Sequence, residues 1–174
     1  MAEEWSRVGV VVVRRRLSGP WAAHEWLPGG VLFPPPDVPD WTRLQAEGDR
    51  ESFYAGAVAL AFHSGETSHY RDNLQSQRPQ VWVQLRPTLG PEGDERVELV
   101  AATVDPYEGE ALADSMGDVL VAIPMPPDLE ARLSEFFAAH HVEREFYKRQ
   151  RKRADPDALG RRGRVDSPGA EDEG

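Results

Sequence analysis

A run of β-branched residues near the start of the chain constrains the fold more than any other feature. Residues 8–13 are five valines and one glycine, and residues 14–16 are all arginine. Valine favours extended backbone because its branched side chain packs well on a pleated surface. We therefore predict a strand over residues 7–17, and the nearly unbroken valines predict burial on both faces of that strand.

The same run does not fit a targeting signal. A secretory signal places basic residues before an apolar stretch of about 7–15 residues, whereas here Glu3 and Glu4 come first and the arginines follow. A twin-arginine signal would also place its arginines ahead of the apolar stretch. No other segment approaches the roughly 20 apolar residues that span a bilayer. We expect a cytoplasmic protein that does not associate with a membrane.

Length, charge and cysteine content narrow the class of protein further. The chain has 174 residues, a formal net charge of -10 and no cysteine. This length accommodates one ordinary domain and a tail. The acidic balance opposes general binding of polyanions. The absence of cysteine excludes disulfides, thiolate metal sites and cysteine nucleophiles.

Alternating hydrophobicity, glycine and proline divide the chain into short strands and connections. Residues 24–33 predict a second strand that runs antiparallel to the first. Pro28 and two glycines interrupt it, so we expect a bulge or a sheet edge there. The proline-rich residues 34–40 predict an irregular connection, and residues 41–48 predict a helical turn or a loop. Further strands are expected at 53–63, 81–86, 97–104 and 118–123, with a hairpin joining 81–86 to 97–104.

Three helices are expected between and after these strands. The first covers residues 67–77, with Glu66 or Ser64 as its cap. The second covers 107–115, with Asp105 as its N-cap. The last begins at Pro127 and carries an apolar stripe. The stripe consists of Leu129, Leu133, Phe136 and Phe137.

Together these elements predict the fold class and the domain boundaries. We expect a single α+β domain over residues 1–147, with a mostly antiparallel sheet of five or six strands and two or three helices. Residues 148–174 form a charged tail without hydrophobic periodicity, which predicts disorder. Its first part is basic and its end acidic, and acids follow the basic part at once. We therefore expect no specific binding of nucleic acid.

One group of polar residues near the first helix is a candidate ligand site. His63, Glu66 and His69 repeat at intervals of three, and Tyr70 and Arg71 follow directly. A metal site needs three or four converging ligands, and this spacing differs from the i, i+4 pair of helical zinc motifs. We expect no metal and no cofactor, and we keep these five residues as an alternative site for a small ligand.

Two other groups are candidates for binding a protein partner. Arginine and tryptophan are common at binding hot spots, although nearby carboxylates would neutralise the arginines if they pair. Two adjacent histidines near the end of the last helix either bind a partner or stabilise that helix end through its dipole. The candidate partner residues are Arg14, Arg15, Arg16, Trp21, Trp26, His140, His141, Tyr147 and Lys148.

Several short blocks, taken in order, resemble a known family. They are the valine and arginine block at residues 8–16, Tyr-Arg-Asp-Asn-Leu at 70–74, Asp-Pro-Tyr-Glu at 105–108, and the segment 140–149 that begins with two histidines. Their order and spacing resemble the proteobacterial domain of unknown function numbered 3305. The resemblance covers roughly residues 7–149.

The resemblance implies a role but no chemistry. Genes of this family tend to lie beside those of molybdenum-dependent formate dehydrogenases and their accessory proteins, and the family brings no established catalytic residues. We therefore expect a non-catalytic accessory or adaptor protein, whose partner is a formate dehydrogenase subunit or a maturation factor. The alternative is a small-ligand or cofactor-binding protein, or a small enzyme, that uses the region of residues 63–71.

Overall fold

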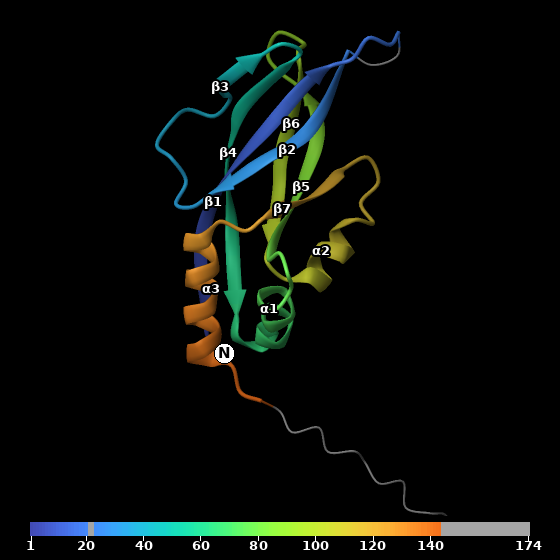
Figure 1. Cartoon of the computed structure of the whole chain (residues 1–174). Helices are drawn as coiled ribbons and strands as arrows, with labels where there is room; N and C mark the ends of the chain where they lie inside the picture. Colours follow the sequence, from blue (N-terminus) through green and yellow to red (C-terminus); the bar gives the residue numbers. More distant parts are fainter. Residues whose placement is uncertain (21–22, 144–174) are drawn as a thin grey trace, which may run out of the picture. The chain divides into compact units, whose positions relative to one another are not determined.

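The computed structural model describes residues 1–20 and 23–143, and within them the chain forms seven strands in two antiparallel sheets (Figure 1). The expected α+β class is confirmed, with the strands divided between two sheets and not gathered in one. The strands are β1 (Glu3–Arg16), β2 (His24–Leu32), β3 (Thr42–Glu47), β4 (Arg50–His63), β5 (Gln80–Leu89), β6 (Glu95–Thr103) and β7 (Val119–Pro124).

The two sheets enclose the hydrophobic core between them. The larger has the strand order β2-β1-β4-β3 and the smaller the order β6-β5-β7. From the larger sheet, Val8, Val10 and Val12 are fully buried, and Val81 and Val83 from the smaller sheet are buried in the same cluster. Such burial stabilises the fold by about 25 cal/mol for each Å² of apolar surface removed from water.

Two irregularities in the larger sheet follow from glycines. In the β1–β2 pair, Val11 lies opposite Gly30 and Val12 opposite Pro28, so Gly29 is the extra residue of a bulge. The predicted interruption of β2 is thereby confirmed. A second bulge lies in β4, where Gly56 has a φ of 119° that an L side chain rarely adopts.

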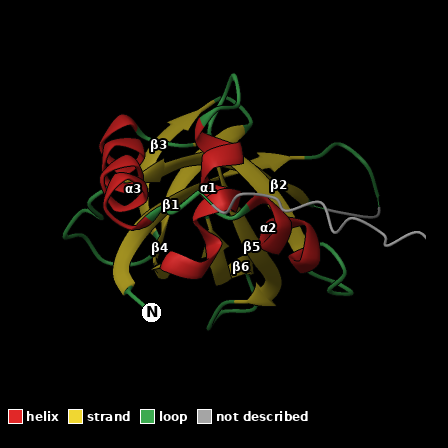
Figure 2. Cartoon of the chain, turned by 90° about the horizontal axis from the view of Figure 1, so that it is seen from below, coloured by secondary structure: helices red, strands yellow, loops and turns green. Residues whose placement is uncertain are grey.

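The helices gather at one end of the sheets, as the view from below shows (Figure 2). The chain passes from β4 through a short 3₁₀ helix, η1 (Ser64–Glu66), into α1 (Thr67–Leu74). The others are α2 (Pro106–Leu112) and α3 (Pro127–His140). Among the helices of the described residues, none is long and apolar enough to cross a membrane.

The final helix packs as its sequence predicts, with one exception. Leu129, Leu133 and Phe136 are buried, and the Phe136 ring lies 5.5 Å from Phe62 and 6.3 Å from Tyr70. Phe137, the fourth residue of the predicted stripe, is only half-buried. The stripe therefore joins α3 to the end of β4 and to α1.

Three local predictions are wrong. Residues 41–48 contain the edge strand β3, which pairs with β4 and buries almost nothing. The valine run is fully buried on only one face, because Val11 and Val13 remain half-buried. Neither Glu66 nor Ser64 caps α1 with its side chain. The predicted tail, residues 148–174, lies outside the described residues.

Candidate functional site

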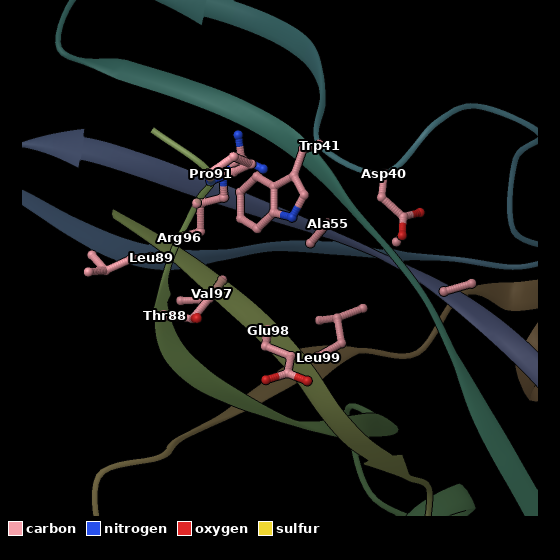
Figure 3. A pocket seen from close by; sticks show the side chains of 13 residues that line it. Asp40, Trp41, Ala55, Thr88, Leu89, Pro91, Arg96, Val97, Glu98 and Leu99 are labelled. Carbon is pink, nitrogen blue, oxygen red and sulfur yellow. The ribbon is translucent and has the colours of Figure 1, made fainter. Parts of the chain in front are cut away.

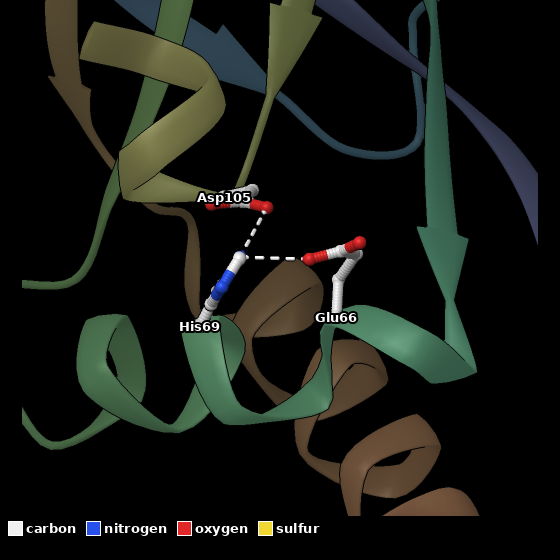
Figure 4. A group of neighbouring side chains, drawn as sticks. All are labelled: Glu66, His69 and Asp105. Atoms are coloured by element: carbon white, nitrogen blue, oxygen red, sulfur yellow. Dashed lines mark hydrogen bonds and ion pairs between the residues drawn. The ribbon is translucent and has the colours of Figure 1, made fainter. Parts of the chain in front are cut away.

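Three polar side chains meet where α1 approaches the start of α2. Glu66 is the last residue of η1, and His69 follows one turn later on α1. Asp105 arrives from a different part of the chain, because β6 ends at Thr103 and α2 begins at Pro106. The three side chains, which we call the His69 cluster, face one another (Figure 4).

The imidazole nitrogen of His69 lies within reach of both carboxylates. Its Nδ1 is 2.8 Å from Oδ2 of Asp105 and 2.9 Å from Oε2 of Glu66. One ligand-type atom from each residue lies within 4.8 Å of the other two. Asp105 is buried, whereas Glu66 and the histidine are partly open to solvent. The cluster can therefore hold a proton or a cation that solvent can reach.

Asp105 is held in place by its second role as a helix cap. Its Oδ1 accepts hydrogen bonds from the backbone N–H of Tyr107 at 2.9 Å and of Glu108 at 3.3 Å. Its own N–H donates to the hydroxyl of Thr103 at 3.0 Å. The predicted cap is confirmed, and it leaves Oδ2 directed at His69.

The ring of His69 also packs against the ring of Tyr107. The two ring centroids are 4.4 Å apart, and the tyrosine hydroxyl donates to Asp72 at 3.2 Å. Burial lowers the pKa of His69, but the hydrogen bond and charge of Asp105, with the charges of Glu66 and Asp72, outweigh it and raise the pKa above its usual value. The charged imidazolium is thus favoured.

The other residues of the predicted ligand site point elsewhere. His63 lies at the end of β4, with its Nδ1 3.7 Å from Glu3. Tyr70 is buried, and its hydroxyl accepts the His63 backbone N–H at 2.9 Å. Arg71 lies beside Asp72 at 3.9 Å. Of the five residues, only Glu66 and His69 direct their side chains toward each other.

A second candidate site is a groove of about 370 Å³ between the bulge of β4 and the edge of β6 (Figure 3). Trp41 lies at one side, and Leu89 and Leu99 contribute apolar surface. The backbone of Trp41 has a φ of 68°, which is unusual for a bulky residue. Its N–H donates to the carbonyl of Tyr54, which fixes the indole at the groove.

Aromatic side chains connect this groove to one of the predicted partner surfaces. The ring of Trp26 is 5.6 Å from Trp41, and Trp41 is 5.8 Å from Phe53. Arg14 lies over Phe53 at 5.0 Å and Arg96 over Trp41 at 5.4 Å. The predicted residues Arg14 and Trp26 therefore belong to one aromatic cluster with Trp41.

The three arginines differ in their surroundings. Arg14 forms an ion pair with Glu51 and Arg15 with Glu25, so nearby carboxylates neutralise both. Arg16 is exposed. Arg14 and Arg16 line a separate hollow near the β3–β4 turn. The arginine triplet is thus not one continuous cationic surface.

The remaining predicted partner residues lie at the opposite end of the sheets or outside the described residues. His140 is the exposed last residue of α3, with its ring 4.5 Å from Phe136. His141 stacks on Phe137, and its Nδ1 lies 3.0 Å from the hydroxyl of Thr67. Trp21, Tyr147 and Lys148 lie outside the described residues.

Comparison with known proteins identifies the family. A family model described as a protein of unknown function, DUF3305, matches residues 7–151. The chain belongs to the DUF3305 family. No curated protein and no solved structure matches it. For this DUF3305 protein, the geometry of the two sites is therefore the main guide to function.

Sequence reasoning missed the site residues that only the tertiary fold brings into place. Asp105 is visible in the sequence as a helix cap, but it lies 36 residues from its partner His69. Trp41 and Leu89 carry no spacing signal, because they line one groove only after the two sheets have packed together. The one available signal for Trp41 was its position directly after the proline-rich connection.

Proposed function

We propose that this DUF3305 protein is a non-catalytic accessory protein of the cytoplasm that binds a protein partner. We further propose that the partner is a subunit or a maturation factor of a molybdenum-dependent formate dehydrogenase. The gene neighbourhood expected for this proteobacterial family motivates the choice of partner. The observation that carries the binding role is the groove at Trp41.

The groove has the composition of a binding hot spot. Tryptophan and arginine are enriched where a few residues supply most of the binding energy, and here Arg96 stacks on Trp41. Backbone strain gathers at functional positions, and Trp41 has a positive φ. Leu89 leaves 68% of its surface exposed at the rim. These features support a surface that an apolar side chain of a partner would cover.

Charge around the groove indicates the kind of segment that would bind. The carboxylates of Asp40 and Glu98 line it, and Asp94 already pairs with Arg96 at 2.6 Å. An apolar anchor flanked by basic residues therefore complements the groove, with the anchor against Trp41 and Leu89. Opposite charges at a rim accelerate association and fix orientation more than they add affinity.

The test is affinity capture from the native host grown with molybdate and formate, read by mass spectrometry. Wild type is compared with Leu89→Asp, which places a charge at the rim and leaves buried residues unchanged. The matched control is Met116→Asp, because Met116 is 98% exposed and does not line the groove. Both variants add one negative charge at an exposed apolar position.

We expect wild type and Met116→Asp to enrich a formate dehydrogenase subunit or maturation factor over an untagged strain. Leu89→Asp should reduce that enrichment at least tenfold. The apolar side chain of the bound protein would cover the new carboxylate and remove it from water without offering it a hydrogen bond. Equal capture by all three proteins would contradict the groove as the binding surface. Failure of wild type to enrich either class of protein would contradict the proposed partner.

The convergence of Glu66, His69 and Asp105 supports a second candidate function, the binding of a small ligand or cofactor. A thermal-shift screen with nucleotides and molybdopterin-type compounds tests it, because a ligand that binds only the folded state raises the unfolding temperature. Stabilisation lost in His69→Gln would favour this function. No shift with any compound would count against it.

A further inference from the structure

The His69 cluster has more acceptors than its own proton can satisfy. Nδ1 of His69 is almost equally close to a carboxylate oxygen of Asp105 and to one of Glu66, at 2.8 and 2.9 Å. A single N–H group makes a straight hydrogen bond to one acceptor only, and hydrogen bonds weaken steeply as they bend. One of the two carboxylates therefore lacks a full donor within the cluster.

The charge balance points the same way. Two carboxylates face one imidazole, and Asp72 adds a third negative charge close enough to act on the ring. The nearby Arg71 lies beside Asp72, not in the cluster. Even with His69 protonated, these groups carry excess negative charge, which attracts a cation.

Two of the three side chains are already held in position by other contacts. The cap fixes Asp105, and contact with Tyr107 fixes the ring of His69. Glu66 is the adjustable member, because its side chain is 43% exposed. A site with two fixed donors and one flexible donor can close around an ion without rearrangement of the fold.

We propose that Oε2 of Glu66, Nδ1 of His69 and Oδ2 of Asp105 bind one divalent transition-metal ion of the zinc class, which displaces the proton on Nδ1 into solvent. Imidazole and carboxylate are ordinary zinc ligands, and three protein ligands with water in the fourth position form an open site. Tetrahedral zinc with bonds of about 2.0–2.2 Å separates its ligand atoms by roughly 3.4 Å. The present separations, from 2.8 to at most 4.8 Å, bracket that value.

Such an ion would connect two parts of the chain that now meet through hydrogen bonds. Glu66 and His69 belong to η1 and α1, whereas Asp105 starts α2. Binding would therefore hold the two helices together and raise the unfolding temperature. The inference goes beyond the accessory role, because the groove at Trp41 is formed by other residues.

The experiment is a zinc titration of the tag-free, full-length protein by isothermal calorimetry, with Co²⁺ as a spectroscopic probe. The variants are Glu66→Gln, His69→Gln and Asp105→Asn. Asparagine caps helices as well as aspartate does, so the last change alters the ligand atom and keeps α2 capped. The control is His63→Gln, which removes an imidazole that, among residues 1–20 and 23–143, pairs with the carboxylate of Glu3 and not with the cluster.

We expect one equivalent of Zn²⁺ to bind wild type and His63→Gln with affinities within twofold of each other. Each cluster variant should bind at least tenfold more weakly and lose the visible absorption of the Co²⁺ complex. Unchanged circular dichroism of the metal-free variants would confirm that they are folded. If wild type binds no zinc, or His69→Gln binds it as tightly, the site is refuted, while the capture result with Leu89→Asp stands independently.

Discussion

The two ends of the paired sheets are closed by different chemistry. At the end that carries the helices, α3 and α1 pack apolar side chains against the sheets. The rings of Phe62, Tyr70 and Phe136 pack together there. At the other end lie the turns between strands (Figure 1). There the rings of Trp26 and Trp41 are half-buried.

Ion pairs and cation–π contacts hold the aromatic side chains at this turn end. Arg14 reaches over Phe53 to Glu51, and Arg96 lies over Trp41 and pairs with Asp94. The contrast separates stability from recognition. Buried apolar surface stabilises a fold strongly and without direction, whereas exposed ion pairs contribute little. The apolar packing at the helix end should therefore tolerate little change, whereas the turn end can vary with the partner that it binds.

The largest expected effect is at the helix end. Phe136→Ala should lower the free energy of unfolding by about 3–5 kcal/mol, because it leaves a cavity among fully packed rings. Only 3% of Phe136 is exposed. Urea unfolding at neutral pH measures the change. Phe137→Ala, one position along on the half-buried side, should cost clearly less, and equal losses would contradict the orientation of α3.

The sequence anticipates the elements whose signals are local. The stripe on α3, the cap at Asp105 and the glycine bulge in β2 are each encoded within a few residues. The strand β3 is not, because five of its six residues are exposed. Pairing with β4 maintains it, and polar sequence without apolar periodicity gives no sign of such pairing.

Contacts between distant segments account for the rest. Nothing near Arg14 in the sequence indicates that Glu51 will neutralise it, since register places Arg14 opposite Glu51 only after β1 and β4 pair. Likewise His69 meets Asp105 only once the two sheets have formed. The division of seven strands into two sheets depends on the same long-range pairing.

Alkaline pH should destabilise the helix end through Tyr70. Burial raises the pKa of Tyr70 to about 12, so the folded state favours the neutral phenol. Its contribution to stability is complete below about pH 10, the ordinary tyrosine pKa, and is lost as pH rises through about 12. The loss should reach about 2–3 kcal/mol, at 1.36 kcal/mol for each pKa unit.

Comparison of wild type with Tyr70→Phe isolates this group from others that titrate at high pH. The variant should be less stable at pH 8 by about 1 kcal/mol, since the hydrogen bond from the His63 amide is lost. Between pH 10 and 12 the difference should shrink or reverse. The contrary result is a free energy of unfolding, measured with urea, that falls equally in both proteins as pH rises. That result would show that the Tyr70 hydroxyl is not the group responsible and that solvent reaches it in the folded state.

The smallest effect is expected at the turn end, from Glu51→Gln. The hydrogen bond from Arg14 lowers the pKa of Glu51, against the opposing effect of burial. A lowered pKa contributes stability above the ordinary value near 4.5, and that contribution disappears as pH falls through the folded value. Because the pair is partly exposed, the substitution should cost only about 0.5 kcal/mol at pH 7.

Salt and acid should both erase this small difference. Unfolding midpoints of wild type and Glu51→Gln, measured at pH 7 and pH 3 and in low and high salt, should differ only at pH 7 in low salt. A loss of several kcal/mol would mean that the turn end depends on this ion pair as the helix end depends on Phe136. In that case the aromatic cluster around Trp26 and Phe53 would be part of the stability core, and Arg14 would not be free to respond to a partner at the neighbouring groove.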